Sequence, residues 1–521
     1  MTIRLRLPVR VVALAAALFA AVAAVPLTAT AAQAVTPICI SGAIQYDYRS
    51  AEDGPAKPTR TKPLRSATVE LWGAEKSTDA PHALDVVGHT ATDNGSYSLC
   101  YVPTTTTSLS TVWVKVRAQS PGNIWRVIDD GDQSNYTFDL PALSNATGEM
   151  NVGTAKPPAN AASPWHIFDT INTLYWKRSN PGSWCWTSHE MDSNQCTPLT
   201  IAWRSYNPGG GSWYTPSTNT ISTGGPDADS EHLILHEVGH FLMHRMFNGA
   251  WPSSLTCGSH WVSYVSTEGC AWSEGFALAA AAYALGDSRY VSPDGGSTSF
   301  TYGDGWGVGD QVEGNVAGSL LDLWRTADTN WNRSIAAITA HKPLTFSAYF
   351  NTTRPAANPP LSTDSTALAK LNPHTIDYGP SIVGNGTYYT LSNGSALAME
   401  VSGSCTAASG ADVVLGTRDA TRAWQRWKLE PNTDGTVRLT NGCAQPLTLT
   451  ANPAAGGTVT AKTYDPANRY QKWKVTRSNG TLKLTSLPTG FALDRKSAAP
   501  GSTVTVYSSG SSNSQSWAAL S

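Results

Sequence analysis

Apolar and polar positions alternate over short stretches in the first quarter of the chain. Residues 67–72, 96–101 and 111–117 are rich in β-branched and aromatic side chains and alternate in part. The tripeptide Asp-Asn-Gly at 93–95 marks a tight turn between two strands. Short strands separated by turns predict an all-β sandwich over residues 36–154. No group of catalytic residue types stands out in this region, so a spacer or folding module is its simplest interpretation.

A helical period replaces the alternation between residues 231 and 247, which read EHLILHEVGHFLMHRMF. Asp229 or Ser230 is placed to cap this helix, and Gly249 is placed to end it. An Ala-rich run from 270 to 285 predicts a second helix, which composition marks as buried, and residues 307–324 predict a third. The apolar residues at roughly helical spacing in the first helix are Leu233, Leu235, Val238, Leu242 and Met246.

Two Pro-rich stretches divide the rest of the chain. One is the linker at 155–164, and the other begins the connecting segment at 351–379. We therefore expect a middle α+β domain over 165–350 and a C-terminal domain over 380–521. At about 150 residues per domain, a chain of 521 residues has room for these parts and the sandwich.

The chain begins with a segment of another kind. Three arginines before position 11 precede a nearly continuous apolar run over residues 11–25, and residues 32–34 read Ala-Gln-Ala. This combination is typical of a secretory signal peptide over residues 1–34. A membrane anchor is the alternative, but a span needs about 20 apolar residues and this run is shorter. We expect a secreted, extracellular protein without a membrane span.

The net charge and the cysteines further restrict the kinds of protein that this chain can be. With 36 Lys and Arg against 38 Asp and Glu, the formal charge of −2 argues against a nucleic-acid binder and a polybasic membrane anchor. The eight cysteines include no C-x-x-C pair, which favours disulfides over a zinc–thiolate site in an exported chain. The sequence leaves the connectivity open. Pairing sequence neighbours gives Cys39–Cys100, Cys185–Cys196, Cys257–Cys270 and Cys405–Cys443.

A repeat organises the C-terminal part. Gln-x-Trp triplets begin at Gln425, Gln471 and Gln515, and an Asn/Asp-Gly-Thr turn precedes each triplet at a similar distance. Three strand-rich units of about 45 residues must stack to bury a common core, which predicts a pseudo-threefold β fold. The segment 380–521 resembles the ricin B-type β-trefoil lectins. The resemblance implies that the triplet Gln and Trp are turn and core residues and do not contact sugar.

A trefoil sugar pocket needs a carboxylate for hydroxyl groups and an aromatic face for the ring. By resemblance to those lectins, the carbohydrate contacts of repeat three are Asp494, Tyr507 and Asn513. Repeat one has Glu400 where Asp is expected and no clear aromatic residue near Leu415. Repeat two has Thr448 in place of the acid, although Tyr464 is present. We expect one working pocket, in repeat three; the alternative is a trefoil that has lost sugar binding.

The middle part contains an H-E-x-x-H motif. On a helix, His236 and His240 project together one turn apart, and two imidazoles at that spacing can bind one Zn²⁺. Glu237 lies beside them as a candidate general base. Glu274 follows in an apolar, helical setting where a bare carboxylate would be costly to bury, so it is the candidate third ligand. A capping role for Glu274 is the alternative.

His260 and Glu268 are rival third ligands. His232 and His244 continue the histidine row on the same helix, but only two helical positions reach one ion well. A donor for the oxyanion of the reaction is also needed. Tyr302, His341 and Tyr378 are candidates, and spacing marks none of them.

This part of the sequence resembles the gluzincin metallopeptidases, with HExxH on one helix and a glutamate in a Ser-Glu-Gly-Phe-Ala setting on the next. The resemblance implies that His236, His240 and Glu274 bind zinc and that Glu237 is the general base. Many gluzincins have an Asp four residues after the glutamate ligand to orient the first histidine, where this chain has Leu278. Residues 219–223, with Trp213 and Tyr214 before them, resemble the edge strand along which such enzymes hold a peptide.

The first part resembles transthyretin-like and carboxypeptidase-regulatory-like domains in its Ala-Thr-Val-Glu-Leu-Trp and Thr-Asp-Asn-Gly-Ser-Tyr stretches. Together these features predict a secreted zinc metallopeptidase that acts on peptides or proteins and binds a glycan or polysaccharide. Two alternatives stay open. One is a carbohydrate-binding protein with a degenerate peptidase domain. The presence of Leu278 where many gluzincins have Asp is the feature that supports it. The other is a glycoside hydrolase, which would need two facing carboxylates that the middle part does not display.

Overall fold

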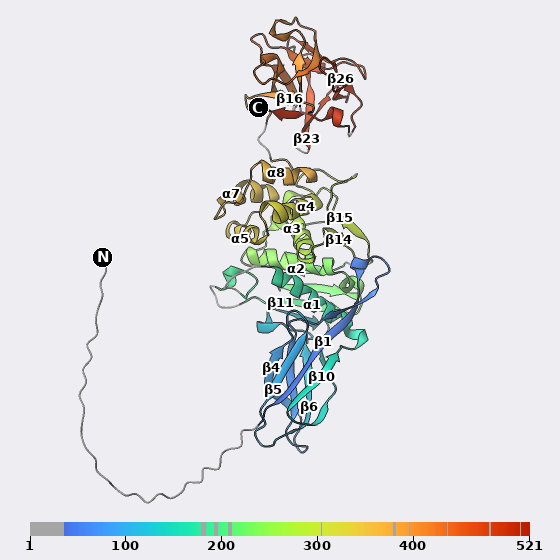
Figure 1. Ribbon diagram of the computed structural model, residues 1–521, viewed down its shortest axis with the longest axis vertical. Coiled ribbons are helices and arrows are strands. Elements are labelled where there is room, and N and C mark those ends of the chain that lie inside the picture. Colours follow the sequence, from blue (N-terminus) through green and yellow to red (C-terminus); the bar gives the residue numbers. More distant parts are fainter. Residues whose placement is uncertain are drawn as a thin grey trace, which may run out of the picture.

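Three parts follow one another along the long axis of the molecule, with a β-rich part at one end and the C-terminal part at the other (Figure 1). The expected signal peptide at 1–34 lies outside the residues that this computed structural model describes. Among those residues, no helix combines the length and apolar character that crossing a membrane requires. The described residues are 36–178, 184–191, 196–206, 211–303, 305–378, 382–394, 396–434, 436–478, 481–510 and 512–520.

The first part is all β, as its alternating stretches predict, and contains two sheets. The turn before β5 needs Gly95, because φ is +71° there and a Cβ would stand 2.6 Å from the carbonyl oxygen of Ile44. One sheet contains β1 (Ile38–Arg49), β2 (Thr59–Pro63), β5 (Ser96–Tyr101) and β10 (Glu149–Ala155). The other contains β3 (Thr68–Ala74), β4 (His82–His89), β6 (Leu109–Arg117), β8 (Thr137–Asp139) and β9 (Leu143–Ala146).

The boundary between the first two parts differs from the expected one. Strand β7 (Trp125–Asp129) lies inside the predicted sandwich region, yet it pairs in parallel with β11 (Leu199–Arg204) of the middle sheet. That sheet continues through β13 (Thr220–Gly224), parallel to β11, to the antiparallel edge strand β12 (Trp213–Thr215). The middle sheet is therefore completed by a strand from the first part.

Helices of the middle part lie beyond this sheet (Figure 1). The predicted first helix is α2 (Glu231–Met246), and Ser230 Oγ accepts the Leu233 N–H at 3.0 Å as its cap. Gly249, with φ +75°, follows its end. The other helices are α1 (Ala162–Lys177), α3 (Glu268–Leu285), α4 (Glu313–Asp322), α5 (Asn332–His341), α6 (Phe346–Ala348), α7 (Arg354–Ala356) and α8 (Ser365–Leu371). A hairpin of β14 (Arg289–Val291) and β15 (Ser297–Ser299) follows α3.

The segment at 351–379, expected as a connection, contains α7 and α8 and belongs to the middle part. The guanidinium of Arg354 is fully buried and forms an ion pair with Asp328 at 2.7 Å. Leu371 and Ile376 lie in the same hydrophobic core as α3 and α4. That core also contains Ile38 and other residues of the first part, so the first two parts share one continuous interior.

Residues 50–58, between β1 and β2, extend from the first part onto the middle part (Figure 1). Glu52 Oε1 accepts the backbone N–H groups of Glu231 at 2.7 Å and His232 at 3.2 Å, and lies 3.2 Å from His232 Nδ1. Lys57 Nζ donates to Asp229 at 2.7 Å, just before α2. A carboxylate of the first part thus caps the helix that bears the HExxH motif.

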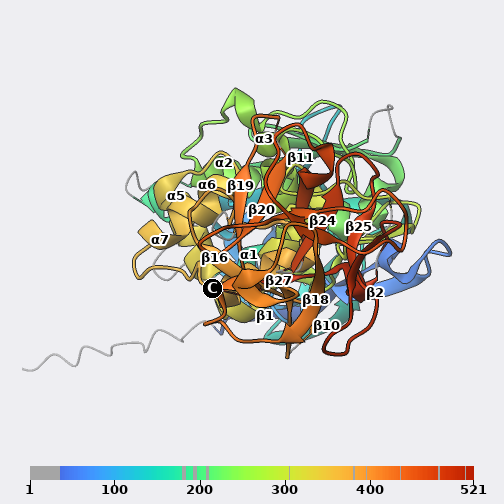
Figure 2. The ribbon, with the colours of Figure 1, turned by 90° about the horizontal axis from the view of Figure 1, so that it is seen from above.

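The C-terminal part is a trefoil-like β structure with a separate hydrophobic core, and Figure 2 looks down onto it. The indoles of Trp427, Trp473 and Trp517 are fully buried, and each donates to a backbone carbonyl at 3.0–3.1 Å. The triplet residues therefore serve as core residues, as predicted. Its strands are β16 (Tyr388–Ser392), β17 (Leu397–Val401), β18 (Ala411–Thr417), β19 (Arg426–Pro431), β20 (Val437–Asn441), β21 (Thr448–Thr450), β22 (Thr460–Lys462), β23 (Trp473–Ser478), β24 (Thr481–Ser486), β25 (Ala492–Arg495), β26 (Val504–Tyr507) and β27 (Ala518–Leu520).

All eight cysteines form disulfides, and the pairing of sequence neighbours is confirmed. Cross-links within each part reduce the conformational entropy of the unfolded chain. The four bonds are Cys39–Cys100, Cys185–Cys196, Cys257–Cys270 and Cys405–Cys443.

Candidate metal centre and cleft

Small residues bring α2 and α3 together. A Cβ on Gly239 would stand 2.8 Å from Ala277 Cα, so only glycine permits this approach. On the far side of α3, a Cβ on Gly275 would stand 2.7 Å from the Val316 side chain of α4. The close crossing turns Glu274 of α3 toward the two motif histidines of α2.

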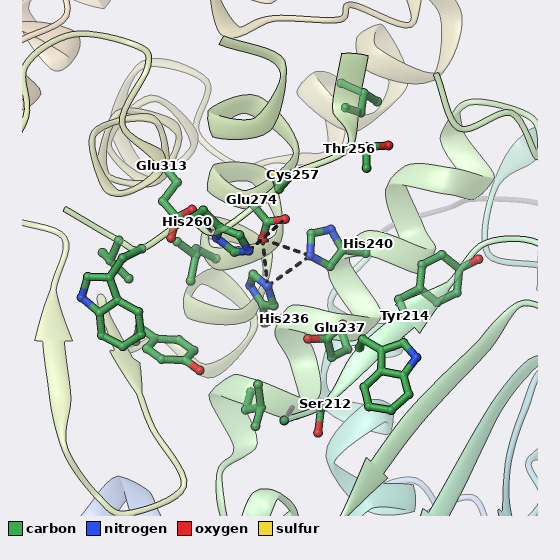
Figure 3. A pocket seen from close by; sticks show the side chains of 18 of the residues that line it. Ser212, Tyr214, His236, Glu237, His240, Thr256, Cys257, His260, Glu274 and Glu313 are labelled. Atoms are coloured by element: carbon green, nitrogen blue, oxygen red, sulfur yellow. Dashed lines mark hydrogen bonds and ion pairs between the residues drawn. The ribbon is translucent and has the colours of Figure 1, made fainter. Parts of the chain in front are cut away.

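Three side chains converge between these helices, as Figure 3 shows. His236 Nε2 and His240 Nε2 lie 3.1 Å apart, and each lies 3.2 Å from Glu274 Oε2. All three residues are buried, with 7–9% of their surface exposed. Tetrahedral bonds of 2.0–2.1 Å would place neighbouring donor atoms about 3.4 Å apart, so the triangle fits a small divalent ion.

The electrostatics of the triangle agree with a cation site. Burial alone would disfavour ionised Glu274, yet His240 and His236 hold the pKa of Glu274 well below its usual range. Its Oε2 atom is buried and has no hydrogen-bond donor among the described residues beyond these two rings. The carboxylate is therefore charged and turned toward the point where the three donor atoms meet.

Glu237 stands beside the triangle on the side of strand β12 (Figure 3). Burial, assisted by the negative charge of Glu274, raises the pKa of Glu237 to about 7. The backbone N–H of Tyr214 donates to the Glu237 carboxylate, and the Tyr214 hydroxyl lies 2.7 Å from His244 Nδ1. The edge strand thus orients a carboxylate that exchanges protons near neutral pH.

The remaining histidines have distinct partners. His232 faces Glu52, and His244 faces Tyr214, so neither joins the triangle. His260 Nδ1 lies 2.8 Å from Glu313 Oε2, while His260 Nε2 lies 3.8 Å from Glu274 Oε1. The Glu313 carboxylate, against the opposing effect of burial, raises the pKa of His260 to about 9. These three residues form a second group within metal-binding distance, sharing Glu274 with the first.

Other sequence candidates lie elsewhere. Glu268 is exposed in the first turn of α3, and His341 is exposed in the last turn of α5. The Tyr378 hydroxyl donates to Asp310, and Tyr302 is 37% exposed and does not line the cleft. The Leu278 side chain lines the cleft and supplies no acceptor, and His236 Nδ1 and His240 Nδ1 have no hydrogen-bond partner among the described residues.

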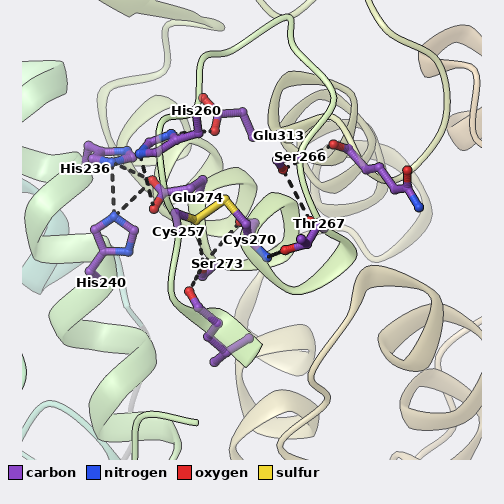
Figure 4. The surroundings of a disulfide bond; sticks show 12 residues. His236, His240, Cys257, His260, Ser266, Thr267, Cys270, Ser273, Glu274 and Glu313 are labelled. Atoms are coloured by element: carbon purple, nitrogen blue, oxygen red, sulfur yellow. Dashed lines mark hydrogen bonds and ion pairs between the residues drawn. A yellow bond between two sulfur atoms is a disulfide. The ribbon is translucent and has the colours of Figure 1, made fainter. Parts of the chain in front are cut away.

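The triangle opens into a cleft of about 620 Å³. Its walls are largely aromatic and aliphatic, and the Cys257–Cys270 disulfide stands at its rim beside Glu274 (Figure 4). Ser273 next to the disulfide donates to the Leu255 carbonyl at 2.8 Å, which fixes the rim to α3. Aromatic residues of the wall are Trp213, Tyr214, Trp251, Trp261 and Tyr290.

Sequence reasoning missed Glu313 and Tyr290, and considered His260 only as a ligand. A signal for Glu313 existed, because it is an acid at the start of an apolar helical stretch. The reasoning applied to Glu274 would also have selected it. Tyr290 lies on a short strand without periodicity, and burial raises its pKa.

The expected sugar residues lie near one another in repeat three. Asp494 Oδ2 accepts Ser514 Oγ and Gln515 Nε2, both at 3.0 Å, and 55% of Tyr507 is exposed. Asn513 begins the short helical turn that contains those two donors. An acid held beside an exposed aromatic ring is the combination that a sugar pocket needs.

Strand pairing corrects the assignments in repeat two. Gln515 bonds to Asp494, Gln425 bonds to Glu400, and Gln471 bonds to Thr450. The position equivalent to Asp494 is thus Thr450, and Thr448 was the wrong residue. Ala492 pairs with Tyr507 and Thr448 with Lys462, so Tyr464 is not the counterpart of Tyr507 either.

Repeat one also lacks the aromatic ring. Its counterpart of Tyr507 is Gly416, which pairs with Ala398. A Cβ on Gly416 would stand 2.2 Å from the Glu400 carboxyl carbon, so the longer acid fills the place that a ring would need. Among the three repeats, repeat three alone combines the acid with the aromatic residue at these positions.

Comparison with known proteins gives matches to three family models. The mycolysin middle domain matches residues 39–163, the mycolysin C-terminal domain matches residues 178–375, and the ricin-type β-trefoil lectin domain matches residues 387–517. The first model includes β7 and the start of α1, in agreement with the shared boundary described above. No curated protein matches the chain.

Solved structures match about a quarter of the chain. The designed threefold-symmetric protein ThreeFoil is 25% identical with a TM-score of 0.24, covering 26% of this chain and 98% of its own. The Rhizoctonia solani agglutinin is 18% identical, with a TM-score of 0.23 and coverage of 26% and 93%. The exo-β-1,3-galactanase of Clostridium thermocellum is 24% identical, with a TM-score of 0.24 and coverage of 26% and 31%.

The two mycolysin models are adjacent and together span more than half of the chain. Their name indicates a peptidase, and the triangle of His236, His240 and Glu274 supplies residues that could hold a metal. The chain therefore belongs to the mycolysin family of peptidases and carries a ricin-type β-trefoil lectin domain at its C-terminal end.

Proposed function

We propose that the protein is a secreted zinc metallopeptidase that hydrolyses peptide bonds and is held at glycans by its trefoil. One observation carries the proposal. Two imidazole nitrogens and one carboxylate oxygen meet at mutual distances of 3.1–3.2 Å beside a buried glutamate. Catalytic zinc is commonly bound by two nitrogen ligands and one oxygen ligand, which leaves the fourth coordination position open for water or substrate.

The residues of the chain have separate tasks in this reaction. A Zn²⁺ ion held by His236, His240 and Glu274 would polarise the scissile carbonyl and acidify water. Glu237 takes a proton from the attacking water and later passes it to the leaving amine. Its pKa of about 7 suits both transfers near neutral pH. The Tyr214 N–H keeps the carboxylate directed into the cleft.

His260 is the best candidate for the oxyanion donor. Its Nδ1 atom is fixed by Glu313 at 2.8 Å, which directs Nε2 toward the side of the triangle opposite strand β12. A preorganised donor aimed at developing negative charge contributes about 10²–10³ in rate. Replacing His260 with Asn should therefore lower kcat by that factor while the zinc content stays unchanged.

The lectin domain supplies attachment to the substrate's surroundings. Asp494, Tyr507 and Asn513 bind a sugar through hydroxyl contacts and ring stacking. Attachment to a glycan raises the local concentration of peptide bonds without adding catalytic contacts. Export agrees with the sequence of the first 34 residues and with four disulfides, which persist in oxidising compartments.

The decisive experiment measures zinc content and peptide cleavage on the same preparations. Glu237→Gln should retain one zinc per chain and lose about 10²–10⁴ in rate. Glu274→Ala should lose both zinc and activity, whereas Glu268→Ala, in the exposed first turn of the same helix, should lose neither. Cleavage should stop with a chelator and return with zinc. Equal activity of wild type and Glu237→Gln would refute the proposal.

A second candidate is a glycan-binding protein whose peptidase site is inactive. The observation in its favour is that His236 Nδ1 and His240 Nδ1 lack acceptors among the described residues, whereas zinc-binding histidines usually donate to one. Substoichiometric zinc in the wild type, together with glycan binding and no cleavage, would support this candidate.

A further inference from the structure

One acidic residue of the cleft has no counter-charge. Asp227 lines the cleft and is 5% exposed, and its Oδ2 atom accepts Ser212 Oγ at 2.9 Å. Burial raises the pKa of Asp227, and among the described residues no cation opposes that effect.

The other acids of the cleft are compensated. Glu313 pairs with His260, Glu274 faces His236 and His240, and Glu237 stands beside that triangle. No lysine or arginine is among the described residues that line the cleft. Asp227 is the remaining acid of the cleft, and among the described residues its side-chain partner is the uncharged Ser212. A buried carboxylate without a cation is costly, and a ligand that brings the cation lowers that cost.

The position of Ser212 locates the Asp227 carboxylate within the cleft. Figure 3 places Ser212 beyond Glu237, on the side of the triangle away from His260 and Glu313. Asp227 is bonded to Ser212, and Leu233 lines the same cleft. The Asp227 carboxylate thus lies, through its bond to Ser212, on the side of the cleft away from the His260–Glu313 pair. A long aliphatic side chain with a charged end has the shape and chemistry for this part of the cleft.

We propose that Asp227 forms a subsite for a cationic group of the peptide substrate, a lysine or arginine side chain or a terminal ammonium. This inference depends on the proposed peptidase function and adds the substrate class. A hydrogen bond between charged partners in a partly desolvated site corresponds to about a ten- to hundredfold preference over an uncharged group.

The test uses the full-length zinc-loaded protein and blocked peptides that differ at one residue. Lysine, glutamine and methionine are compared at four positions, the two residues before the cleaved bond and the two residues after it. At one position, lysine should exceed both neutral residues in kcat/KM by about tenfold or more. A parallel series with free amino termini at that position separates an ammonium terminus from a side chain.

Two variants locate the effect. Asp227→Asn should reduce the preference for lysine to less than about twofold while the methionine peptide is cleaved at a similar rate. Asp294→Asn removes an exposed acid beside Pro293 of the cleft wall and should keep the preference. Equal loss in both variants, or no preference in the wild type, would overturn the inference but leave the peptidase function intact.

A measurement on the wild type alone covers the case in which Asp227→Asn does not fold. Butylammonium should inhibit cleavage of the methionine peptide competitively, and butanol at the same concentration should not. Equal inhibition by the two compounds, or none by either, would overturn the subsite. Failure to cleave any peptide would refute the proposed function and this inference with it.

Discussion

Glu52 belongs to the first part of the chain, yet we predict that it stabilises the helix that bears the HExxH motif. One of its carboxylate oxygens accepts two backbone N–H groups at the start of α2 and faces His232 Nδ1. Removing a cap costs about 1 kcal/mol, and a negative charge at a helix N-terminus adds about 0.3–1 kcal/mol. The side chain of Glu52 is 16% exposed, so solvent screens these contacts only in part.

Glu52→Ala should therefore lower the free energy of unfolding by about 1–2 kcal/mol. Glu52→Gln keeps an acceptor but loses the charge and should cost less. His236 lies one turn after His232, so looser first turns should also weaken zinc binding in Glu52→Ala. Urea unfolding and competition with a chelator measure the two effects.

The control is Asp53→Asn, because Asp53 is exposed in the same segment and pairs with Arg60. That change should stay within about 0.5 kcal/mol. A Glu52→Ala protein with the stability and zinc affinity of Asp53→Asn would show that the cap does not hold the helix. Rescue by Glu52→Asp in the same assays would indicate that the carboxylate itself is required.

Three further predictions concern the site and the lectin. Gly239→Ala places a Cβ 2.8 Å from Ala277 Cα and should cost about 1–3 kcal/mol and weaken zinc binding, whereas equal stability and affinity would contradict the close crossing. Burial raises the pKa of Glu237 from 4.5 to about 7. The folded state therefore keeps a proton on Glu237 that the unfolded state has lost, and the contribution of Glu237 to the free energy of unfolding is present below pH 4.5 and lost as the pH rises to about 7. In urea unfolding of the zinc-free protein, the free energy of unfolding of Glu237→Gln should equal that of the wild type near pH 4 and exceed it by about 3 kcal/mol above pH 7. A difference that does not depend on pH would contradict the raised pKa. Tyr507→Ala should abolish retention on a glycan array that the wild type binds, while Tyr464→Ala should not, and the reverse result would place the pocket in repeat two.

Local signals explain which features the sequence predicts well. The helix at 231–246 and its Ser230 cap follow from periodicity and a capping residue within one short segment. Glu274 follows from the cost of a bare carboxylate in an Ala-rich helix. Both depend on neighbours in the chain, and the structure brings the expected residues together.

Features that depend on distant partners escaped prediction. The pairing of β7 with β11 joins segments about 70 residues apart, and nothing in the spacing of Trp125–Asp129 reveals it. The assignment of Thr448 is a different kind of error, because Thr450 precedes Gln471 by 21 residues, the same spacing that separates Asp494 from Gln515. The His260–Glu313 pair spans 53 residues and lies at a loop and a helix start, where no period exists.

The two separate hydrophobic cores determine which parts of such a protein can be exchanged during evolution. The trefoil has its own core, so exchanging it for another module would leave the core shared by the first two parts intact. The first part offers no such freedom, because its strand β7 completes the middle sheet and its Glu52 carboxylate caps the helix that bears the HExxH motif. The C-terminal module can therefore be replaced as a unit, whereas the N-terminal sheets must be inherited together with the middle part.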